Sequence, residues 1–231
     1  MSEALTVNKS PQGMAVRALD GAHEMVLGTA LRYLPQKGRA LDLGAWSGAL
    51  TQRLQAGGFE VVAADVENQF GLPTEFVNVD CNDPNFDRKF SSRFDLVVAV
   101  EVIEHLENPT AFLRSIGRLL NEAGIAIVTT PNVDNAAARL KFFRSGKVRA
   151  MEANNPEHIT PVHLDLFVRQ TVPAAGLRLI ENFVYPEGQF PLTGRRYFVA
   201  LFKLAALLMN GPALTGDTHV FVLRRNCAAK P

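Results

Sequence analysis

The chain has 231 residues, of which 47% are apolar and 20% are charged, proportions that exclude a disordered or fibrous protein. Lysine plus arginine (24) nearly balances aspartate plus glutamate (23), so no overall field would collect long nucleic acid or hold the chain on an anionic bilayer. At this length we expect one domain over residues 1–231.

The cysteines and the apolar stretches bear on the compartment. Cys81 and Cys227 are too few for a disulfide framework and lack metal-finger spacing. The first residues have no signal-peptide pattern. The apolar stretch 197–209 is shorter than the roughly 20 residues of a membrane span, and we expect a core helix or a lid beside a greasy substrate. We therefore expect a cytoplasmic protein without a transmembrane segment.

Short apolar runs alternate with helical patterns in the first part of the chain. A helix is expected over residues 16–34, and a second helix follows the glycine-containing turn at 44–48. Asn108 as a cap and Pro109 in the first turn indicate a third helix. Five nearly continuous apolar runs predict strands buried on both faces, as in a parallel sheet covered by helices. They span residues 39–43, 60–65, 76–79, 94–100 and 124–130.

The regularity loosens after the fifth predicted strand. Residues 133–165 are rich in Arg, Lys, Asn, Pro and His, which indicates an insertion over the active face. Its basic residues form a solvated helix face or hold a phosphate, a carboxylate or a membrane headgroup; they are Arg139, Lys141, Arg144, Lys147 and Arg149. Residues 166–231 would supply a helix at 166–175, strands at 177–184 and 218–223, and the apolar helix.

Glycines and carboxylates stand where the first three strands end. Gly44 and Gly48 flank a turn that lets backbone approach a ligand closely. Asp65 is placed to accept hydrogen bonds from both hydroxyls of a cofactor ribose. Asp80 is similarly placed to meet an adenine amino group, with the Cys81 N–H near a ring nitrogen. The sequence therefore predicts a nucleoside-containing cofactor at this edge of the sheet.

The stretch from Asp42 to Gly48 reads D-L-G-A-W-S-G and resembles D-x-G-x-G-x-G, the first motif of the class I (Rossmann-like) S-adenosylmethionine-dependent methyltransferases. The segments 61–65, 78–80, 101–106 and 129–132 are similar to later motifs of this family, in the family's order. The resemblance covers residues from about 15 to 132, and points to the small-molecule, ubiquinone-pathway-like branch. Residues 15–132 would then be the cofactor-binding core.

The resemblance implies an α/β fold: a three-layer sandwich around seven mostly parallel strands in the order 3-2-1-4-5-7-6, the last antiparallel. The cofactor would be S-adenosyl-L-methionine, with S-adenosyl-L-homocysteine as product. The turn at Gly44 would face the methionine moiety, Asp65 the ribose, and Asp80 with Cys81 the adenine, while Asp42 would orient the turn. The expected cofactor-binding positions are Asp42, Gly44, Ala45, Trp46, Gly48, Asp65, Val66, Asp80, Cys81, Val100 and Glu101.

Trp46 departs from the family pattern, because it stands where the family usually has its middle glycine. A bulky L-residue is disfavoured at positive φ and can block a close approach. Either Trp46 points away and packs on a helix, or it narrows the pocket and weakens cofactor binding.

Candidate catalytic residues are His105 and Glu104, next to the expected sulfonium, and His158 in the insertion. The stretch from Glu101 to His105 also resembles a divalent-metal motif of small-RNA 2′-O-methyltransferases and some ubiquinone-pathway relatives. Metal ligands would then be Glu101, Glu104, His105 and His158. Two other roles are open for this stretch. His105 could act as a base or orient the acceptor, or the stretch could simply form the start of a helix. We favour the structural helix start and do not expect a metal. His158 and His163 are either loop histidines or frame the acceptor pocket.

The acceptor remains open between a small metabolite or quinone-like hydroxyl, a sugar and an RNA end. Neutral charge argues against long RNA, and the apolar stretch leaves room for peripheral membrane contact. We expect O-methylation of a small molecule. The alternatives are a methyltransferase-fold binding or regulatory protein without turnover and, least favoured, a nicotinamide-dependent oxidoreductase, because G-x-G-x-x-G is absent. Oligomeric state cannot be derived from these patterns.

Overall fold

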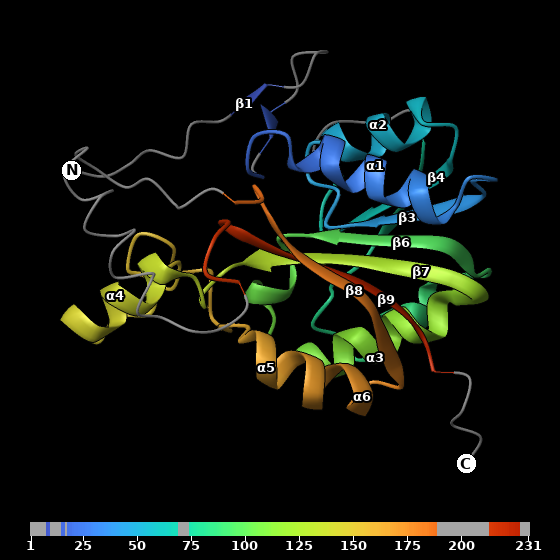
Figure 1. Ribbon diagram of the computed structural model, residues 1–231. Coiled ribbons are helices and arrows are strands. Elements are labelled where there is room, and N and C mark those ends of the chain that lie inside the picture. Colours follow the sequence, from blue (N-terminus) through green and yellow to red (C-terminus); the bar gives the residue numbers. More distant parts are fainter. Residues whose placement is uncertain (1–7, 10–14, 17, 69–73, 189–212, 227–231) are drawn as a thin grey trace.

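A computed structural model of the chain describes residues 8–9, 15–16, 18–68, 74–188 and 213–226. They form three layers, with a twisted sheet between two sets of helices (Figure 1). Within these ranges no helix is both long enough and apolar enough to cross a bilayer. The predicted apolar helix at 197–209, and Cys227, lie outside the described residues.

Seven strands form the central sheet in the spatial order β5-β4-β3-β6-β7-β9-β8. Strand β9 pairs antiparallel with β7 and β8, whereas the pairings from β5 to β7 are parallel. Numbered from β3, this is the order 3-2-1-4-5-7-6, so the predicted fold is confirmed. The strands are β3 (Arg39–Leu43), β4 (Glu60–Asp65), β5 (Glu75–Asn78), β6 (Phe94–Val100), β7 (Leu120–Pro131), β8 (Leu177–Tyr185) and β9 (Thr218–Arg225). A separate ladder pairs β1 (Asn8–Lys9) with β2 (Ala15–Val16).

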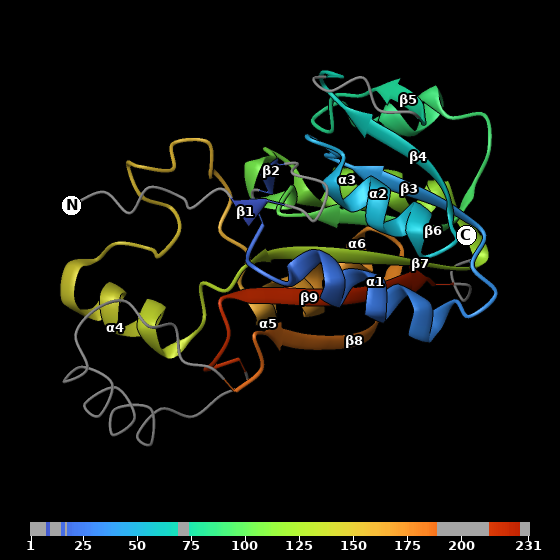
Figure 2. The ribbon, with the colours of Figure 1, turned by 90° about the horizontal axis from the view of Figure 1, so that it is seen from above.

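Helices cover both faces of the sheet, as Figure 2 shows from above. Helices α1 (Ala22–Tyr33) and α2 (Ala49–Ala56) lie on one face. Helix α3 (Pro109–Leu119) lies on the other with a helical segment made of α5 (Leu164–Leu166), the π-turn η3 (Phe167–Thr171) and α6 (Val172–Ala174). Helix α4 (Ala136–Ser145) stands beside these layers, and two short 3₁₀ turns are η1 (Phe86–Lys89) and η2 (Ile103–His105).

The side chains of β6 point alternately to the two faces of the sheet, so this strand contributes to the hydrophobic core on each face. Leu96 and Val98 face the core beneath α1 and α2, whereas Val97 and Ala99 face the core beneath α3, and all four are 0% exposed. Successive side chains of a strand point to opposite faces, so a strand covered on both sides has to be apolar throughout. This accounts for the continuous apolar runs in the sequence.

Most boundaries fall within two residues of the predictions, and the largest differences are at the starts of α1 and β7. Helix α1 begins at Ala22 rather than near residue 16, because residues 15–16 pair with β1. Strand β7 begins at Leu120 rather than at residue 124, since Leu120 pairs with Phe94 across a register shift. Strand β5 ends at Asn78, one residue early. The Asn108 cap of α3 is confirmed, as its side chain accepts a hydrogen bond from Ala111 N–H at 3.0 Å.

Candidate active site

The turn after β3 is fastened to the carboxyl end of β4. The N–H groups of Gly44 and Ala45 both donate to the Ala64 carbonyl, at 2.8 and 3.2 Å. The Trp46 N–H donates to Asp65 Oδ2 at 2.8 Å, and the Val66 N–H donates to Oδ1 at 2.7 Å. The Asp65 carboxylate is thereby oriented at the edge where β3 and β4 both end.

Positive φ values shape this turn at Gly44 (75°), Trp46 (42°) and Gly48 (75°). A Cβ on Gly44 would lie 2.6 Å from Val102 Cγ2, so the turn also needs glycine for space. Trp46 occupies a left-handed conformation that a bulky L-residue rarely adopts, and its side chain is half-buried. Gly48 directly precedes α2 and, like Ala45, is buried.

Asp42 lies beneath the turn rather than facing it, with 2% of its surface exposed. Its Oδ2 accepts a hydrogen bond from the Thr51 hydroxyl at 2.6 Å, which ties β3 to α2. Burial raises the pKa of the Asp42 carboxyl to about 6. The hydrogen bond from Thr51 acts in the opposite direction, and the charge of Asp65 adds a smaller increase. Asp42 is therefore placed to hold the turn between β3 and α2.

The end of β5 carries the positions predicted to meet adenine. Asp80 is exposed, and its Oδ1 accepts a hydrogen bond from the Asn82 N–H at 2.8 Å. Cys81 is half-buried, and burial raises the pKa of its thiol to about 12, with Asp65 and Asp80 adding to the shift. This neutral thiol is no nucleophile. Val66 is 56% exposed beside this edge.

Beyond β6 the chain bends at Glu101, whose φ is 53°. The Glu101 N–H donates to Thr129 Oγ1, and that hydroxyl donates to Glu101 Oε1, both at 3.0 Å. Burial raises the pKa of the Glu101 carboxyl to about 7, although the hydrogen bond from Thr129 acts in the opposite direction. Val100, directly before this bend, is partly buried, so the predicted inner edge of the site is tied to β7.

Glu104 is a fully buried carboxylic acid in η2, with 0% of its surface exposed. Neither of its carboxyl oxygens makes a hydrogen bond of normal geometry with the described residues, although Glu101 and Thr130 lie beside it. Burial, followed by the charge of Glu101, raises the pKa of Glu104 well above its usual value. A buried polar group without a partner is costly, so this arrangement calls for a ligand or a shared proton.

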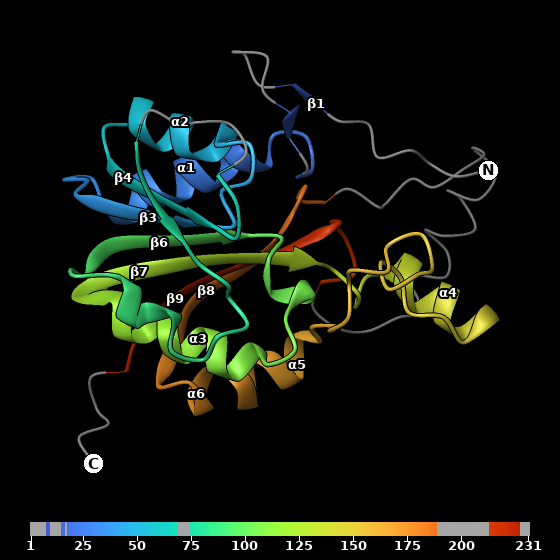
Figure 3. The same ribbon diagram turned by 180° about the vertical axis from the view of Figure 1, so that it is seen from behind.

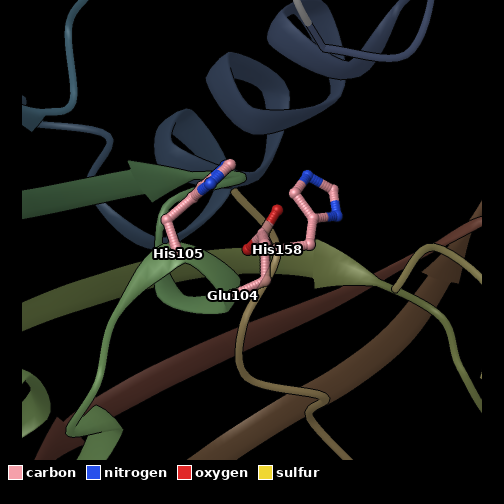
Figure 4. A group of neighbouring side chains, drawn as sticks. All are labelled: Glu104, His105 and His158. Atoms are coloured by element: carbon pink, nitrogen blue, oxygen red, sulfur yellow. The ribbon is translucent and has the colours of Figure 1, made fainter. Parts of the chain in front are cut away.

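The imidazoles of His105 and His158 lie against each other, with ring centroids 4.7 Å apart and an interplanar angle of 87°. His105 Nδ1 faces the Glu157 carbonyl at 3.1 Å, and His158 Nδ1 faces the Ala150 carbonyl at 2.8 Å. A carbonyl accepts only from a protonated nitrogen, so in the neutral rings the lone pair resides on Nε2. Figure 4 shows the Glu104 carboxylate between the two rings.

One potential ligand atom from each of Glu104, His105 and His158 lies within 4.8 Å of the others. The segment that carries His158 is pinned to η2, because the N–H groups of Ile159 and Thr160 both donate to the Glu104 carbonyl at 2.9 Å. The structure thus brings together all three predicted catalytic residues. This Glu-His-His set suits a divalent cation.

A second histidine group lies outside this cluster. His163 Nδ1 lies 3.0 Å from Asp134 Oδ1, and the Leu164 N–H donates to Oδ2 at 2.7 Å. Burial raises the pKa of the Asp134 carboxyl, but His219, Leu164 and His163 together hold it well below its usual range. The sequence analysis missed Asp134, and only its position just after β7 could have singled it out. His219 is 0% exposed and lies in the core.

Known proteins resemble this chain in sequence and in fold. A family model described as a methyltransferase domain matches residues 20–182. Ubiquinone biosynthesis O-methyltransferase of Azorhizobium caulinodans is 36% identical over 107 residues, 42% of each chain. Its counterpart in Cereibacter sphaeroides is 32% identical over 111 residues, 43% of this chain and 44% of the relative. The chain thus matches less than half the length of these curated relatives.

Solved structures match over more of the chain at lower identity. A SAM dependent methyltransferase from Archaeoglobus fulgidus has a TM-score of 0.60 and 15% identity, covering 88% of this chain and 94% of its own. The 1,6-didemethyltoxoflavin-N1-methyltransferase of Burkholderia thailandensis, solved with S-adenosylhomocysteine, has a TM-score of 0.56 and 15% identity, covering 89% and 79%. At this identity the likeness establishes the fold.

Proposed function

Because this chain belongs to the family of class I methyltransferase domains, we propose that it transfers a methyl group from S-adenosylmethionine to a hydroxyl group of a small acceptor. The observation that carries the proposal is the joint placement of a glycine turn, an oriented Asp65 and a Glu-His-His cluster at one edge of the sheet. In an open α/β sheet, ligands bind beyond the carboxyl ends of the strands.

Asp65 is the residue that would bind the ribose of S-adenosylmethionine. Each of its carboxylate oxygens already accepts one backbone hydrogen bond, and a carboxylate oxygen has two lone pairs, so both retain capacity for a ribose hydroxyl. Glycine at position 44 is needed for the turn itself, because its φ is 75° and a Cβ would lie 2.6 Å from Val102 Cγ2. Asp80 and Cys81 would border the adenine, and Val66 offers it an exposed apolar contact. The turn lacks the third glycine of a pyrophosphate nest, which suits a cofactor without phosphate.

The reaction would be an in-line displacement. The acceptor oxygen bonds to the methyl carbon, the carbon–sulfur bond breaks with its electron pair remaining on sulfur, and the hydroxyl proton passes to a base. The leaving group is good, so the protein has mainly to position the acceptor and exclude water. Glu104, His105 and His158 are the catalytic residues of this proposal: without a cation, the Nε2 lone pair of His105 or His158 would accept the hydroxyl proton, and with a cation on these atoms the proton would pass to water.

We propose further that Glu104, His105 and His158 hold a divalent cation, with Glu101 as the neighbouring fourth group. The fit rests on the two buried Glu104 oxygens that lack normal hydrogen bonds and on two imidazoles whose Nδ1 atoms face carbonyls. In metal sites, a carbonyl that accepts a hydrogen bond from the other ring nitrogen fixes the orientation of a metal-binding histidine. A bound cation would lower the pKa of an acceptor hydroxyl and align two adjacent oxygens. This cluster geometry supports a cation site, rather than the structural helix start that was favoured from the sequence.

The acceptor class follows from this chemistry. A cation beside the methyl donor suits an acceptor with two neighbouring oxygens, such as a catechol-like ring or a vicinal diol of a sugar. Similarity to ubiquinone O-methyltransferases, matched over 42–44% of their length, supports the former. The second candidate function is a methyltransferase-fold binding or regulatory protein without turnover. It is supported by Trp46, which has a φ of 42° in the expected cofactor turn.

The test is transfer of radiolabelled methyl from S-adenosylmethionine to 3,4-dihydroxybenzoate, with 4-hydroxybenzoate as the matched acceptor lacking the second hydroxyl. We expect labelling of the catechol that depends on added Mg²⁺, Mn²⁺ or Zn²⁺ and is lost in Glu104→Gln. Labelling of both acceptors without any metal would overturn the cation proposal. Cofactor binding without transfer to catechols or to diols of sugars would favour the binding protein.

A further inference from the structure

Helix α4 projects from the three layers, as the views from the front and from behind both show (Figures 1 and 3). Its first turn is anchored: Ala136 to Ala138 are buried, and the Asn135 side chain accepts from Ala138 N–H at 2.8 Å and donates to the Gly216 carbonyl at 3.0 Å. Its last turn is exposed and ends in a left-handed Gly146. The base is therefore fixed to the fold, while the tip faces outward.

The tip, residues 142–147, carries two adjacent exposed aromatic side chains. Phe142 is 57% exposed and Phe143 is 88% exposed, the highest value among the large exposed hydrophobic residues of the described chain. Scattered exposed apolar residues need no explanation, but two neighbouring rings at the end of a projecting helix are costly unless something covers them.

Positive charge surrounds these rings. Residues 136–151 contain five basic residues and no acidic one. Lys141 pairs with Glu152, and Arg149 pairs with Asp217 at 2.6 Å. Arg144 and Lys147, directly beside the phenylalanines, are exposed and form no ion pair with the described residues. The chain as a whole has a net charge of only +1, so the tip is a local basic patch on a nearly neutral molecule.

We propose that the tip of α4, residues 142–147, docks this protein onto a bilayer surface that carries anionic headgroups. Aromatic rings beside lysine and arginine match the two layers of such a surface, because the rings enter the boundary with the acyl chains while the cations meet headgroup phosphates. A second copy of the chain fits less well, since a symmetric contact through the tip would bring Arg144 and Lys147 of both copies together.

Docking at this tip would turn the carboxyl edge of the sheet toward the bilayer. Helix α4 follows five residues after β7 ends, and the chain returning from it supplies His158 to the cluster. An apolar acceptor dissolved in the membrane would then face the site. The docking itself does not rest on the proposed methyl transfer.

The experiment is sedimentation of the purified full chain with vesicles of phosphatidylcholine alone and with about one third phosphatidylglycerol, at low and high salt. We expect binding to the anionic vesicles only, weakened by salt. Phe142→Ser/Phe143→Ser should weaken binding by about tenfold or more through lost apolar burial. Arg144→Gln/Lys147→Gln should weaken it by roughly fivefold for each charge removed.

Matched controls use residues elsewhere on the surface. Leu166→Ser removes a side chain that is 50% exposed, and Arg88→Gln/Arg93→Gln removes two exposed charges near the start of β6; both variants should bind vesicles like the wild type. The proposal is overturned by equal binding to neutral vesicles, or by phenylalanine variants that bind normally. Two other outcomes would also overturn the proposal. One is a dimer in solution that dissociates in the same variants, and the other is binding of single-stranded RNA, rather than vesicles, that is lost in the same variants. Vesicle binding needs no cofactor, so its failure is distinct from failure of methyl transfer.

Discussion

The Trp46 backbone N–H donates a 2.8 Å hydrogen bond to Asp65 Oδ2, joining the turn after β3 to the last residue of β4. This bond orients the carboxylate that would bind the cofactor ribose and, from the other side, fixes a tryptophan whose φ is 42°. If Asp65 binds the cofactor as proposed, cofactor affinity and the shape of this turn would be coupled through this residue.

Gly44→Ala should impair both folding and cofactor binding. Its Cβ would meet Val102 Cγ2 at 2.6 Å, and its φ of 75° disfavours any residue with a side chain. We expect a loss of about 1–3 kcal/mol in the free energy of unfolding, measured by urea denaturation. Adding Val102→Ala to Gly44→Ala should relieve the clash but not the backbone strain at residue 44. Full recovery in the double variant would show that φ is unimportant here.

Trp46→Gly restores the glycine that the family usually has. It should relieve strain of about 1 kcal/mol in the left-handed conformation. Because the N–H that binds Asp65 is retained, we expect S-adenosylhomocysteine affinity within about threefold of the wild type by calorimetry. Trp46→Phe keeps an aromatic ring as the control. A gain of more than about tenfold in Trp46→Gly alone would mean that the indole narrows the pocket.

Divalent cations should stabilise the metal-stripped protein through the Glu-His-His cluster. At about 100 times Kd, a cation adds about 2.7 kcal/mol, a Tm increase of roughly 5–10 °C at this chain length. Glu104→Gln and His158→Ala should abolish the increase, measured by calorimetric melting. His163→Ala removes an imidazole held by Asp134 outside the cluster and should retain it. Equal increases in all four proteins would contradict this site.

Asp42→Asn should change the pH dependence of stability. The folded pKa of about 6 lies above the ordinary 3.8, so folding favours the protonated carboxyl. Its stabilising contribution is complete below about pH 4 and is lost as the pH rises through 6. Asparagine cannot ionise, so the variant should gain on the wild type by up to about 3 kcal/mol between pH 4 and 7 in urea unfolding. A constant difference across this range would contradict the buried-acid account.

The sheet could be predicted because its chemistry is local. Runs buried on both faces must be apolar, and β3, β4 and β6 therefore appear in the sequence with their observed bounds. Strand β7 could not be bounded in the same way, because the pairing of Leu120 with Phe94 depends on a register shift that composition does not reveal.

The candidate site could be predicted only in part. Asp65 is visible as a carboxylate that ends a strand. The family resemblance groups His158 with His105, but their contact cannot be derived from the residues alone, because it depends on hydrogen bonds from residues 159–160 to the Glu104 carbonyl. Only its position just after β7 points to Asp134, since its partner His163 is 29 residues away along the chain.

The most direct test of the cofactor site is calorimetric titration of S-adenosylhomocysteine into the wild type, Asp65→Ala and the control Asp165→Asn, whose carboxylate is exposed on α5. Trp46, the single tryptophan of the chain, gives a second fluorescence readout from the turn itself. We predict micromolar binding to the wild type and to Asp165→Asn, weakened by about tenfold to 100-fold in Asp65→Ala, as for lost hydrogen bonds to a charged group. Absence of binding to the wild type, or equal binding to all three proteins, would contradict the account.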